Sequence, residues 1–420
     1  MSDKFSRKQK QIIAFPNSGY DALICDGSVR SGKTSIMSVA FVLWAMRDFN
    51  HCNFGICSKT VQTAMKNVIK PLLAMTYMQK RFTMKYSRTT GELVISRGDR
   101  QNVFYIYGGK DESSYMLIQG ITLAGVFLDE VALMPRSFVE QALARCSVDG
   151  SKFWFNCNPE GPLHWFNVEW VEQPEAHNAL RLHFTMADNP SLTQKIRERY
   201  ESMYSGVFYD RYIKGLWVAA DGIIYDMFDR DVHVLTEEPE TEGDYWVSSD
   251  FGIQNATVFL LWRRIKNTNH WVCLREWYYS GREEKKQKTV AELVDGLQDM
   301  LAGIDPKAVI IDPSATALIL ECKKRGFRTR RADNDVLNGI ADVSTMLHQN
   351  RLYYMASCKG LIEEKGLYAW DAKAADRGED RPIKDHDHAC DAERYFVHTL
   401  RLVKRDASGD SKEDRFNMFL

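Results

Sequence analysis

Apolar runs and polar breaks alternate along the first half of the chain. Short runs rich in apolar and β-branched residues, typical of strands, occupy 21–26, 53–58, 93–95, 103–107, 125–130 and 151–159. Helical patterning covers 35–46 and the residues that lead from the second strand to position 73. Strands that alternate with helices predict an α/β fold with a mostly parallel sheet.

The pattern restarts in the second half. Strands are predicted at 245–250, 256–262, 271–277 and 308–312, with a helix at 289–301 and a final helix from about 386 to 403. We therefore expect a first domain at 1–221, whose helical end (191–221) leads into a linker at 222–243. A second domain at 244–403 and a charged, disordered tail at 404–420 follow.

Composition narrows the class of protein without naming a partner. With 420 residues and 45% hydrophobic content, the chain can form two packed cores. The N-terminus is polar, no apolar run reaches the ~20 residues of a membrane span, and nine cysteines show no paired spacing. These features predict a cytoplasmic protein without a membrane segment. A net charge of −1 neither indicates nor excludes a nucleic-acid partner.

One motif carries more information than any other feature. The segment 27–34 matches the phosphate-loop pattern G-x-x-x-x-G-K-[ST] between a predicted strand and a predicted helix. A chance glycine-rich turn is the alternative, and the complete context disfavours it. Backbone N–H groups of such a loop bind phosphate, Lys33 can reach the β- and γ-phosphates, and Thr34 can ligate Mg²⁺. The candidate nucleotide-binding residues are Gly27, Ser28, Val29, Arg30, Ser31, Gly32, Lys33 and Thr34.

Hydrolysis needs further groups, and Asp129 and Glu130 end an apolar strand where they can supply them. Asp129 would hold Mg²⁺ and Glu130 would polarise the attacking water as a general base. Two acids that cap a following helix are the alternative. Asn158 ends the next strand and could sense the γ-phosphate, although Asn-Pro is also a common turn.

Three further assignments are left open between function and structure. Arg30 or Arg145 could stabilise charge in the transition state, and both could equally form structural ion pairs. Gln11, before the first strand, could recognise an adenine edge. With the phosphate loop, these residues predict ATP with Mg²⁺ as the nucleotide ligand.

A second set of candidate residues lies in the other half. Asp250 and Asp312 end predicted strands, and Asp391 lies on the last helix three residues after His388. Such groups suit two divalent ions, Mg²⁺ or Mn²⁺, which promote in-line displacement at phosphorus. Each residue alone has an ordinary reading as a turn, a helix start or a solvated helix end. The order β-β-β-α-β with acids on the first and fourth strands is the one that ribonuclease H-like nucleases use, and it favours a nuclease.

Taken together, these motifs resemble the large subunit of a tailed-bacteriophage terminase, the DNA-packaging motor. The resemblance extends from about Gln11 to Val403. It rests on the phosphate loop and the carboxylate set, and on 126–130, 156–159, 188–190, 215–217 and 222–225. Only the phosphate loop is generic, and the set in this order is specific.

The resemblance implies a RecA-like ATPase domain of the additional-strand type and a ribonuclease H-like nuclease domain. It implies cutting of concatemeric double-stranded DNA and ATP-driven translocation of DNA into a procapsid, in the cytoplasm of the bacterial host. The implied partners are the portal protein, a small terminase subunit and further copies of the chain in a ring on the portal. Residues 119–127 contain no arginine, so a trans-acting arginine has no secure match.

Two other classes of function stay open at this point. An ATP-gated DNA-binding or remodelling protein without nuclease activity would need the carboxylates only for structure. Near-neutral charge mildly favours it, because long DNA needs a basic track. Three acids at strand and helix positions argue against it, because clustered carboxylates repel one another without metal. A helicase-like remodeller would need a second RecA-like domain, which the sequence does not supply.

Overall fold

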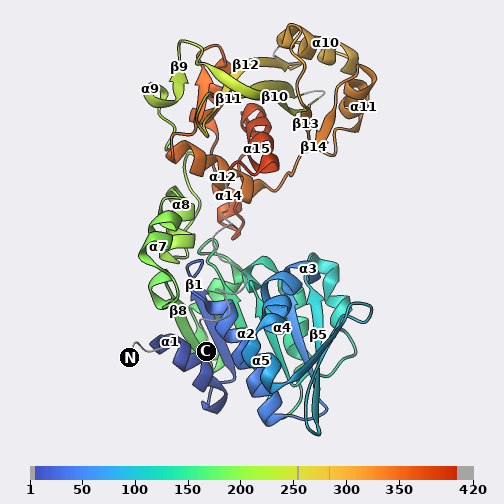
Figure 1. Cartoon of the computed structure of the whole chain (residues 1–420), viewed down its shortest axis with the longest axis vertical. Coiled ribbons are helices and arrows are strands. Elements are labelled where there is room, and N and C mark those ends of the chain that lie inside the picture. Colours follow the sequence, from blue (N-terminus) through green and yellow to red (C-terminus); the bar gives the residue numbers. More distant parts are fainter. Residues whose placement is uncertain (1–4, 253–254, 283, 404–420) are drawn as a thin grey trace. The chain divides into compact units, whose positions relative to one another are not determined.

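The computed structural model describes residues 5–252, 255–282 and 284–403. The predicted tail at 404–420 lies outside them. The chain forms two compact units (Figure 1). The first runs to Glu201 and includes Val207–Ala219, and the second includes Ser202–Gly206 and the described residues from Ala220 onward.

The first unit is built on an 8-stranded sheet with the order β3-β4-β5-β2-β6-β7-β1-β8. The strands from β5 to β8 in that order are parallel, and β3 and β4 extend the sheet as antiparallel strands. β7 lies between β1, which precedes the phosphate loop, and β6, which ends at Asp129. This is the additional-strand arrangement, so the structure confirms the predicted class of ATPase fold.

The strands of this unit are β1 (Ala22–Gly27), β2 (Asn53–Ser58), β3 (Thr83–Ser87), β4 (Glu92–Arg97), β5 (Arg100–Gly108), β6 (Gly125–Asp129), β7 (Lys152–Cys157) and β8 (Ala179–Phe184). Its helices are α1 (Arg7–Ala14), α2 (Lys33–Asp48), α3 (Val61–Ala64), α4 (Lys70–Ala74), α5 (Thr76–Arg81), α6 (Arg136–Ala144) and α7 (Gln194–Glu201). α8 (Gly206–Tyr209) begins at the junction of the two units. Short helical turns are η1 (Phe15–Asn17), η2 (Met65–Ile69), η3 (Glu112–Ile118), η4 (Val131–Leu133), η5 (Asn167–Val171), η6 (Pro174–His177), η7 (Met186–Asp188) and η8 (Asp210–Lys214).

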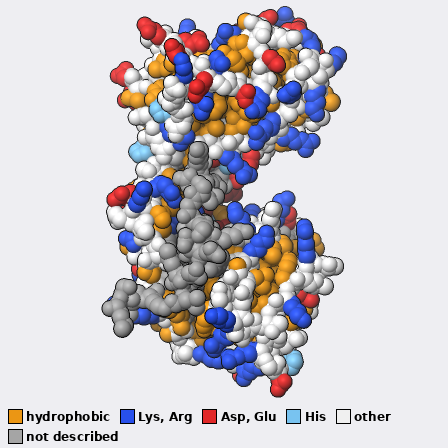
Figure 2. All heavy atoms as spheres, viewed as in Figure 1, with side chains coloured by type: hydrophobic (Ala, Val, Ile, Leu, Met, Phe, Trp, Pro, Cys, Tyr) orange, Lys and Arg blue, Asp and Glu red, His pale blue; other side chains and the backbone are white. Residues whose placement is uncertain are grey.

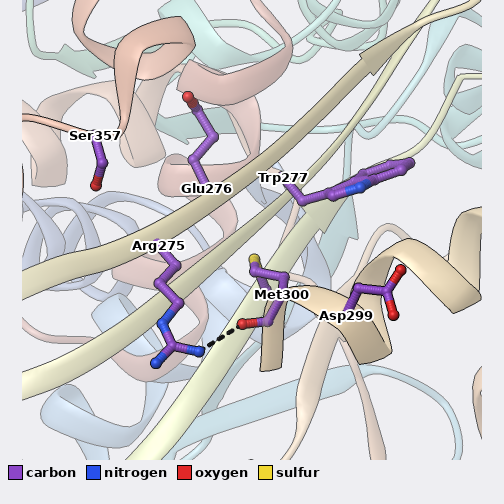
Figure 3. A pocket seen from close by; sticks show the side chains of 6 residues that line it. All are labelled: Arg275, Glu276, Trp277, Asp299, Met300 and Ser357. Atoms are coloured by element: carbon purple, nitrogen blue, oxygen red, sulfur yellow. Dashed lines mark hydrogen bonds between the residues drawn. The ribbon is translucent and has the colours of Figure 1, made fainter. Parts of the chain in front are cut away.

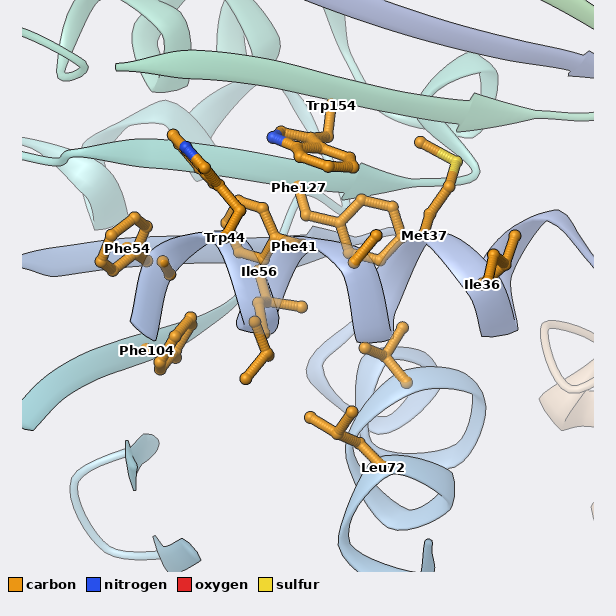
Figure 4. Close-up of a cluster of buried hydrophobic side chains, with 14 of the residues drawn as sticks. Ile36, Met37, Phe41, Trp44, Phe54, Ile56, Leu72, Phe104, Phe127 and Trp154 are labelled. Atoms are coloured by element: carbon orange, nitrogen blue, oxygen red, sulfur yellow. The ribbon is translucent and has the colours of Figure 1, made fainter. Parts of the chain in front are cut away.

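An aromatic cluster packs α2 against this sheet. The Phe41 ring lies 5.7 Å from the Trp154 ring and 6.0 Å from the Phe104 and Phe127 rings, centroid to centroid (Figure 4). All four side chains are fully buried. Aromatic side chains of this size dominate core energetics, so the cluster fixes α2, and the phosphate loop before it, on the sheet.

The second unit contains a 7-stranded sheet with the order β14-β13-β10-β11-β12-β15-β9. β10, β11 and β12 are consecutive antiparallel strands, and β13 joins β10 in parallel after the crossover helix α10. This is the predicted β-β-β-α-β order, and the ribonuclease H-like fold is confirmed.

Its strands are β9 (Val234–Leu235), β10 (Thr241–Asp250), β11 (Ala256–Ile265), β12 (Trp271–Ser280), β13 (Val309–Ile311), β14 (Thr329–Arg331) and β15 (Leu352–Met355). Its helices are α9 (Arg230–His233), α10 (Val290–Leu301), α11 (Thr316–Lys324), α12 (Val336–His348), α13 (Lys359–Leu367), α14 (Ala372–Ala375) and α15 (His388–Leu400). Residues 222–243, assigned to a linker from the sequence, carry α9 and β9 within this unit.

The two faces of the second sheet have different partners. Val247 and Phe259 belong to a core cluster with residues of α10 and α11. On the other face, the Trp262 ring stacks on Phe396 of α15 at 4.6 Å between centroids. Because side chains alternate along a strand, Asp250 lies on the same face as Ser248, whose hydroxyl accepts from Trp262 Nε1. Asp250 therefore faces α15.

No helix in the described ranges is long and apolar enough to cross a bilayer.

Candidate functional sites

The phosphate loop (27–34) begins at Gly27, the last residue of β1, and ends at Thr34 in the first turn of α2. Gly27 has φ +130°, and a Cβ there would lie 1.9 Å from the Phe184 carbonyl oxygen, so no other residue fits. Gly32 has φ +83°, the left-handed conformation that glycine adopts without strain. Both glycines are thus required by the backbone of the loop.

Lys33 lies inside the curve of the loop. Its Nζ donates to the carbonyl oxygens of Gly27 and Ser28 at 3.0 and 2.8 Å, and to Ser31 Oγ at 3.2 Å. It also reaches Asn158 Oδ1, at 3.3 Å. Burial lowers the pKa of Lys33 to about 8, although nearby negative charges, including those of Asp26 and Asp129, act to raise it. The structure therefore brings Asn158 into hydrogen-bond contact with Lys33.

Thr34 and Asp129 meet at the predicted Mg²⁺ position. Thr34 Oγ1 donates to Asp129 Oδ1 at 2.9 Å. Within the described residues, the buried Asp129 Oδ2 has no hydrogen-bond partner, although the Asn67 amide lies close enough to lower the pKa of this carboxyl. Burial has the larger effect and raises that pKa. A buried oxygen without a partner beside a hydroxyl fits a divalent cation bound with the nucleotide.

Asn156 is a member of this site that the sequence analysis did not assign. Its Nδ2 donates to Asp129 Oδ1 at 2.6 Å and to Thr34 Oγ1 at 2.7 Å. Asn156 and Asn158 are two residues apart along the direction of β7, so alternation alone would have placed them on one face. Asn156 could therefore have been assigned to the site from its spacing to Asn158.

Glu130 stands one residue beyond β6 with φ +61°, a left-handed conformation that is uncommon outside glycine. Burial, and then the charge of Asp129, raise its pKa to about 7. A carboxyl whose pKa is near neutrality is suited to general-base catalysis.

The remaining nucleotide-site predictions concern Arg30, Arg145 and Gln11, and the structure places only Arg30 in the phosphate loop. Arg30 is in the loop, but its guanidinium stacks over the Tyr200 ring at 5.2 Å from the centroid. The Arg145 carbonyl accepts from Leu123 N, before the start of β6, whereas Asp129 is at the end of that strand. A strand rises about 3.3 Å per residue, so the structure does not bring Arg145 to the loop of its own chain.

Gln9, rather than Gln11, lies against the phosphate loop. Gln9 is buried, and its Nε2 is 3.5 Å from where a Cβ on Gly32 would lie. Gln11 is partly exposed on α1. Gln9 precedes the buried Ile12 by three residues, so the two share the buried side of this amphipathic helix. That spacing, which the sequence analysis did not use, would have favoured Gln9 over Gln11.

The Asp26 carboxylate anchors the far side of the loop. It accepts from Arg181 Nη2 at 2.9 Å and from Trp217 Nε1 at 3.1 Å, and it lies 3.3 Å from His183 Nδ1. Burial alone would raise its pKa, but the hydrogen bonds from His183 and Arg181 lower it to about 2. The motif at 215–217 therefore packs directly behind the loop.

The predicted nuclease residues gather at one edge of the second sheet. Asp250 Oδ2 lies 2.9 Å from His388 Nδ1. Parallel pairing of β10 with β13 places Asp312 beside the end of β10, where it accepts from Ser314 N at 2.7 Å. Burial most of all, and then the negative charges of Asp391, Asp250 and Asp312, raise the pKa of the Tyr395 phenol. All three acids therefore lie near enough to Tyr395 for their charges to act on it, and Asp312 also pairs with its hydroxyl.

These acids do not form a finished metal cage. Nowhere in the part of the chain that the structure describes do three or more His, Cys, Asp or Glu side chains converge as metal ligands. Asp391 Oδ1 accepts from Arg394 Nη2 at 3.0 Å and from the Tyr368 hydroxyl at 3.3 Å, and its Oδ2 accepts from Lys384 Nζ at 3.0 Å.

The donor chemistry nevertheless fits divalent ions. Burial raises the pKa of Asp250, and the charge of Asp391 adds to that effect, while the His388 hydrogen bond opposes it. Carboxylates that crowd one another in this way are relieved by a hard cation with oxygen ligands.

A separate hollow of about 370 Å³ opens on the second unit between β12 and the end of α10 (Figure 3). Arg275 crosses it and donates to the Met300 carbonyl at 2.8 Å. Glu276 accepts from Gly360 N and Leu361 N at the start of α13. None of the predicted site residues line this hollow, and Arg275 and Glu276 are both engaged by helix ends.

Known proteins resemble the chain in sequence and in fold. Residues 24–231 match the family model described as terminase large subunit, T4likevirus-type, N-terminal. The large terminase of a thermophilic bacteriophage is 49% identical, with a TM-score of 0.89, over 94% of this chain and 99% of that one. A structure of the same phage's large terminase in complex with ADP is 47% identical, with a TM-score of 0.88, over 94% and 100% of the two chains.

A curated relative, the terminase large subunit of Escherichia phage T5, is 22% identical over 60% of this chain and 59% of its own length. Its match thus spans about three fifths of that protein. The match to the thermophilic-phage terminase covers nearly the whole chain at high identity, and the residues of both predicted sites fall within the two folds described above. The chain belongs to the terminase large-subunit family.

Proposed function

We propose that this chain is the motor subunit of a tailed phage that hydrolyses ATP to move double-stranded DNA into a procapsid and cuts concatemeric DNA with its second unit. The observation that carries the proposal is the hydrogen-bonded set of Lys33, Thr34, Asp129, Asn156 and Asn158 around the phosphate loop. It occurs in a chain that is 47% identical to a large terminase seen with ADP.

In the first unit, each residue has one task. The loop amides and Lys33 bind the phosphates, and Asn156 orients Thr34 and Asp129 toward the cation. Glu130 accepts a proton from the attacking water, and Asn158 links the γ-phosphate position to Lys33. Mg²⁺ bound there would neutralise the charge on the β- and γ-phosphates. Gln9 or Gln11 would contact the base, and a guanidinium from Arg30 or from the Arg145 of a neighbouring copy would complete the site.

In the second unit, Asp250, Asp312 and Asp391 would hold the metal ions. His388 fixes Asp250 through their 2.9 Å contact and can move a proton there. Two Mg²⁺ or Mn²⁺ ions would activate the water and stabilise the leaving oxygen. The ATPase domain of the first unit and the nuclease domain of the second would act on the same DNA, in the host cytoplasm and on the portal. The portal protein, a small terminase subunit and a ring of identical copies are the proposed partners.

The test separates the two activities in full-length protein. Lys33→Ala should abolish ATP turnover and leave Mn²⁺-dependent plasmid cleavage, because Lys33 and the carboxylates belong to different folded units. Asp312→Ala should abolish cleavage and leave ATP turnover. Phosphate release and plasmid nicking are measured in one reaction. Cleavage that persists in Asp312→Ala would contradict the nuclease assignment, and turnover that persists in Lys33→Ala would contradict the ATP site.

A further inference from the structure

Asp391 is held by two cations that differ in mobility. Arg394 is 2% exposed and also donates to the backbone carbonyl oxygens of Asn334 and Asp335. The Lys384 side chain is 65% exposed. The hydrogen-bond partners that the structure describes for it are both carboxylates, Asp387 and Asp391. Arg394 is therefore a fixed part of the fold, whereas Lys384 is free to leave at small cost.

The Lys384 ammonium occupies a position that a metal ion would seek. Its Nζ is 3.0 Å from Asp391 Oδ2 and 3.0 Å from Asp387 Oδ2. Asp387 in turn is 3.9 Å from His388 Nδ1, which contacts Asp250. The ammonium thus neutralises the charge of two neighbouring carboxylates, Asp387 and Asp391. A divalent ion that takes Asp391 Oδ2 as a ligand must displace it.

DNA supplies a reason for the ammonium to move. A phosphate group that arrives at the acids offers Lys384 another anionic partner, and lysine binds phosphate as a point charge on a flexible stem. Exchange of one exposed ion pair for another costs little. The same movement would uncover Asp391 Oδ2.

We propose that Lys384 occupies the metal-binding oxygen of Asp391 until a DNA phosphate draws the ammonium away, so that DNA binding opens the site for the divalent ion. The inference rests on the proposed nuclease function and adds a way in which DNA would regulate it. The nuclease would then bind metal weakly without DNA and become competent where DNA is present.

The test measures Mn²⁺ binding directly. Full-length protein without nucleotide is titrated with Mn²⁺, and the unbound Mn²⁺ is quantified from its electron paramagnetic resonance signal. Lys384→Met should bind Mn²⁺ about two- to fivefold more tightly than the wild type when DNA is absent, the range expected for loss of an exposed ion pair. Lys384→Arg retains the charge and should match the wild type. The matched control is Lys266→Met, because Lys266 pairs with Glu240 at 2.7 Å on the same unit.

The second arm adds a hydrolysis-resistant phosphorothioate duplex. The duplex should tighten Mn²⁺ binding to the wild type by a similar factor and have little effect on Lys384→Met. Equal Mn²⁺ affinity of wild type and Lys384→Met without DNA would overturn the proposal, as would an equal effect of DNA on both. Binding is read without cleavage. A failure of the nuclease assignment, seen as cleavage by Asp312→Ala, is therefore distinguishable from a failure of this inference.

Discussion

Glu130 and Lys33 have pKa values close to neutrality, about 7 and about 8, because both are buried. Glu130 acts as a base only when ionised, so turnover should fall as the pH drops below about 7. Lys33 binds phosphate best as an ammonium, so turnover should also fall as the pH rises above about 8. We expect kcat/KM for ATP to be bell-shaped, because this parameter reports groups of the free enzyme.

Steady-state phosphate release across the pH range measures this profile. Lys33→Arg keeps its charge at all accessible pH values, so any residual activity should lose the alkaline limb and keep the acidic one. A wild-type profile that stays level between about pH 6 and about pH 9 would show that neither group limits the reaction.

Residues whose role depends on sequence spacing were predictable, and residues whose role depends on a neighbouring element were not. The phosphate-loop motif identifies Lys33 and Thr34 without any knowledge of the tertiary structure. Asp129 was identified by its position at the end of an apolar strand, and the structure places it against Thr34. Arg145 was a candidate because it follows Asp129 in sequence, but the chain turns back after α6 and leaves it at the other end of β6. The contacts of Lys384 could not be predicted from the sequence, because its partners Asp387 and Asp391 meet it only once α15 has folded.

At the scale of elements, η8 presses a glycine against the phosphate loop. Gly215 has φ +76°, and a Cβ there would lie 2.7 Å from Ser28 N and 2.9 Å from Gly27 Cα. Val29 N also donates to the Tyr212 carbonyl at 2.8 Å. Gly215→Ala should therefore lose about 1–2 kcal/mol through backbone strain and about 1–3 kcal/mol more through overpacking. It should also weaken ATP binding, because the clash falls on the loop itself.

Gly120→Ala is the matched control. Gly120 has φ +75° in the same unit, with nothing within 4 Å of the position that an added methyl group would take. It should show the strain cost in thermal unfolding and leave nucleotide affinity unchanged. Equal nucleotide affinity in both variants would mean that η8 does not shape the loop.

Strands with continuous burial were predictable, and edge strands were not. β1 and β6 are buried at every position, so their apolar runs stand out in the sequence. β8 mixes polar and apolar residues at the edge of the first sheet, and β14 is a three-residue edge strand of exposed and partly exposed side chains. Such edge strands gain their structure from pairing with a neighbour and leave little pattern in the sequence.

At the scale of the whole molecule, charge gives little guidance to the DNA path. Lys and Arg side chains are interspersed with Asp and Glu on the visible face of each unit (Figure 2). The total of 55 basic and 56 acidic residues fits this mixture. The order of motifs predicted two domains, because each motif set belongs to a different fold. Composition could not locate the boundary, because the acidic stretch before residue 244 resembles a linker while its neighbours pack into the second unit.

The packing of residues 220–243 allows a test with fragments. Tyr225 is 1% exposed, and the buried Lys365 ammonium lies 3.8 Å from its ring centroid. β9 pairs with β15 in the same stretch. A fragment of residues 220–403 should therefore fold and cut plasmid with Mn²⁺, whereas a fragment of 244–403 should lose about 3 kcal/mol or more, the usual cost of removing a buried aromatic side chain.

Thermal unfolding and plasmid cleavage are measured for both fragments. A third fragment, 202–403, keeps the segment whose Met203 and Ser202 carbonyl oxygens accept from Thr345 and Gln349 of the second unit. It should be at least as stable as 220–403. If 244–403 were equally stable and active, residues 220–243 would be a linker in function as well as in composition. If it unfolds as expected, the nuclease begins near Ala220, and the boundary lies where the phosphate-loop contacts of 207–219 end.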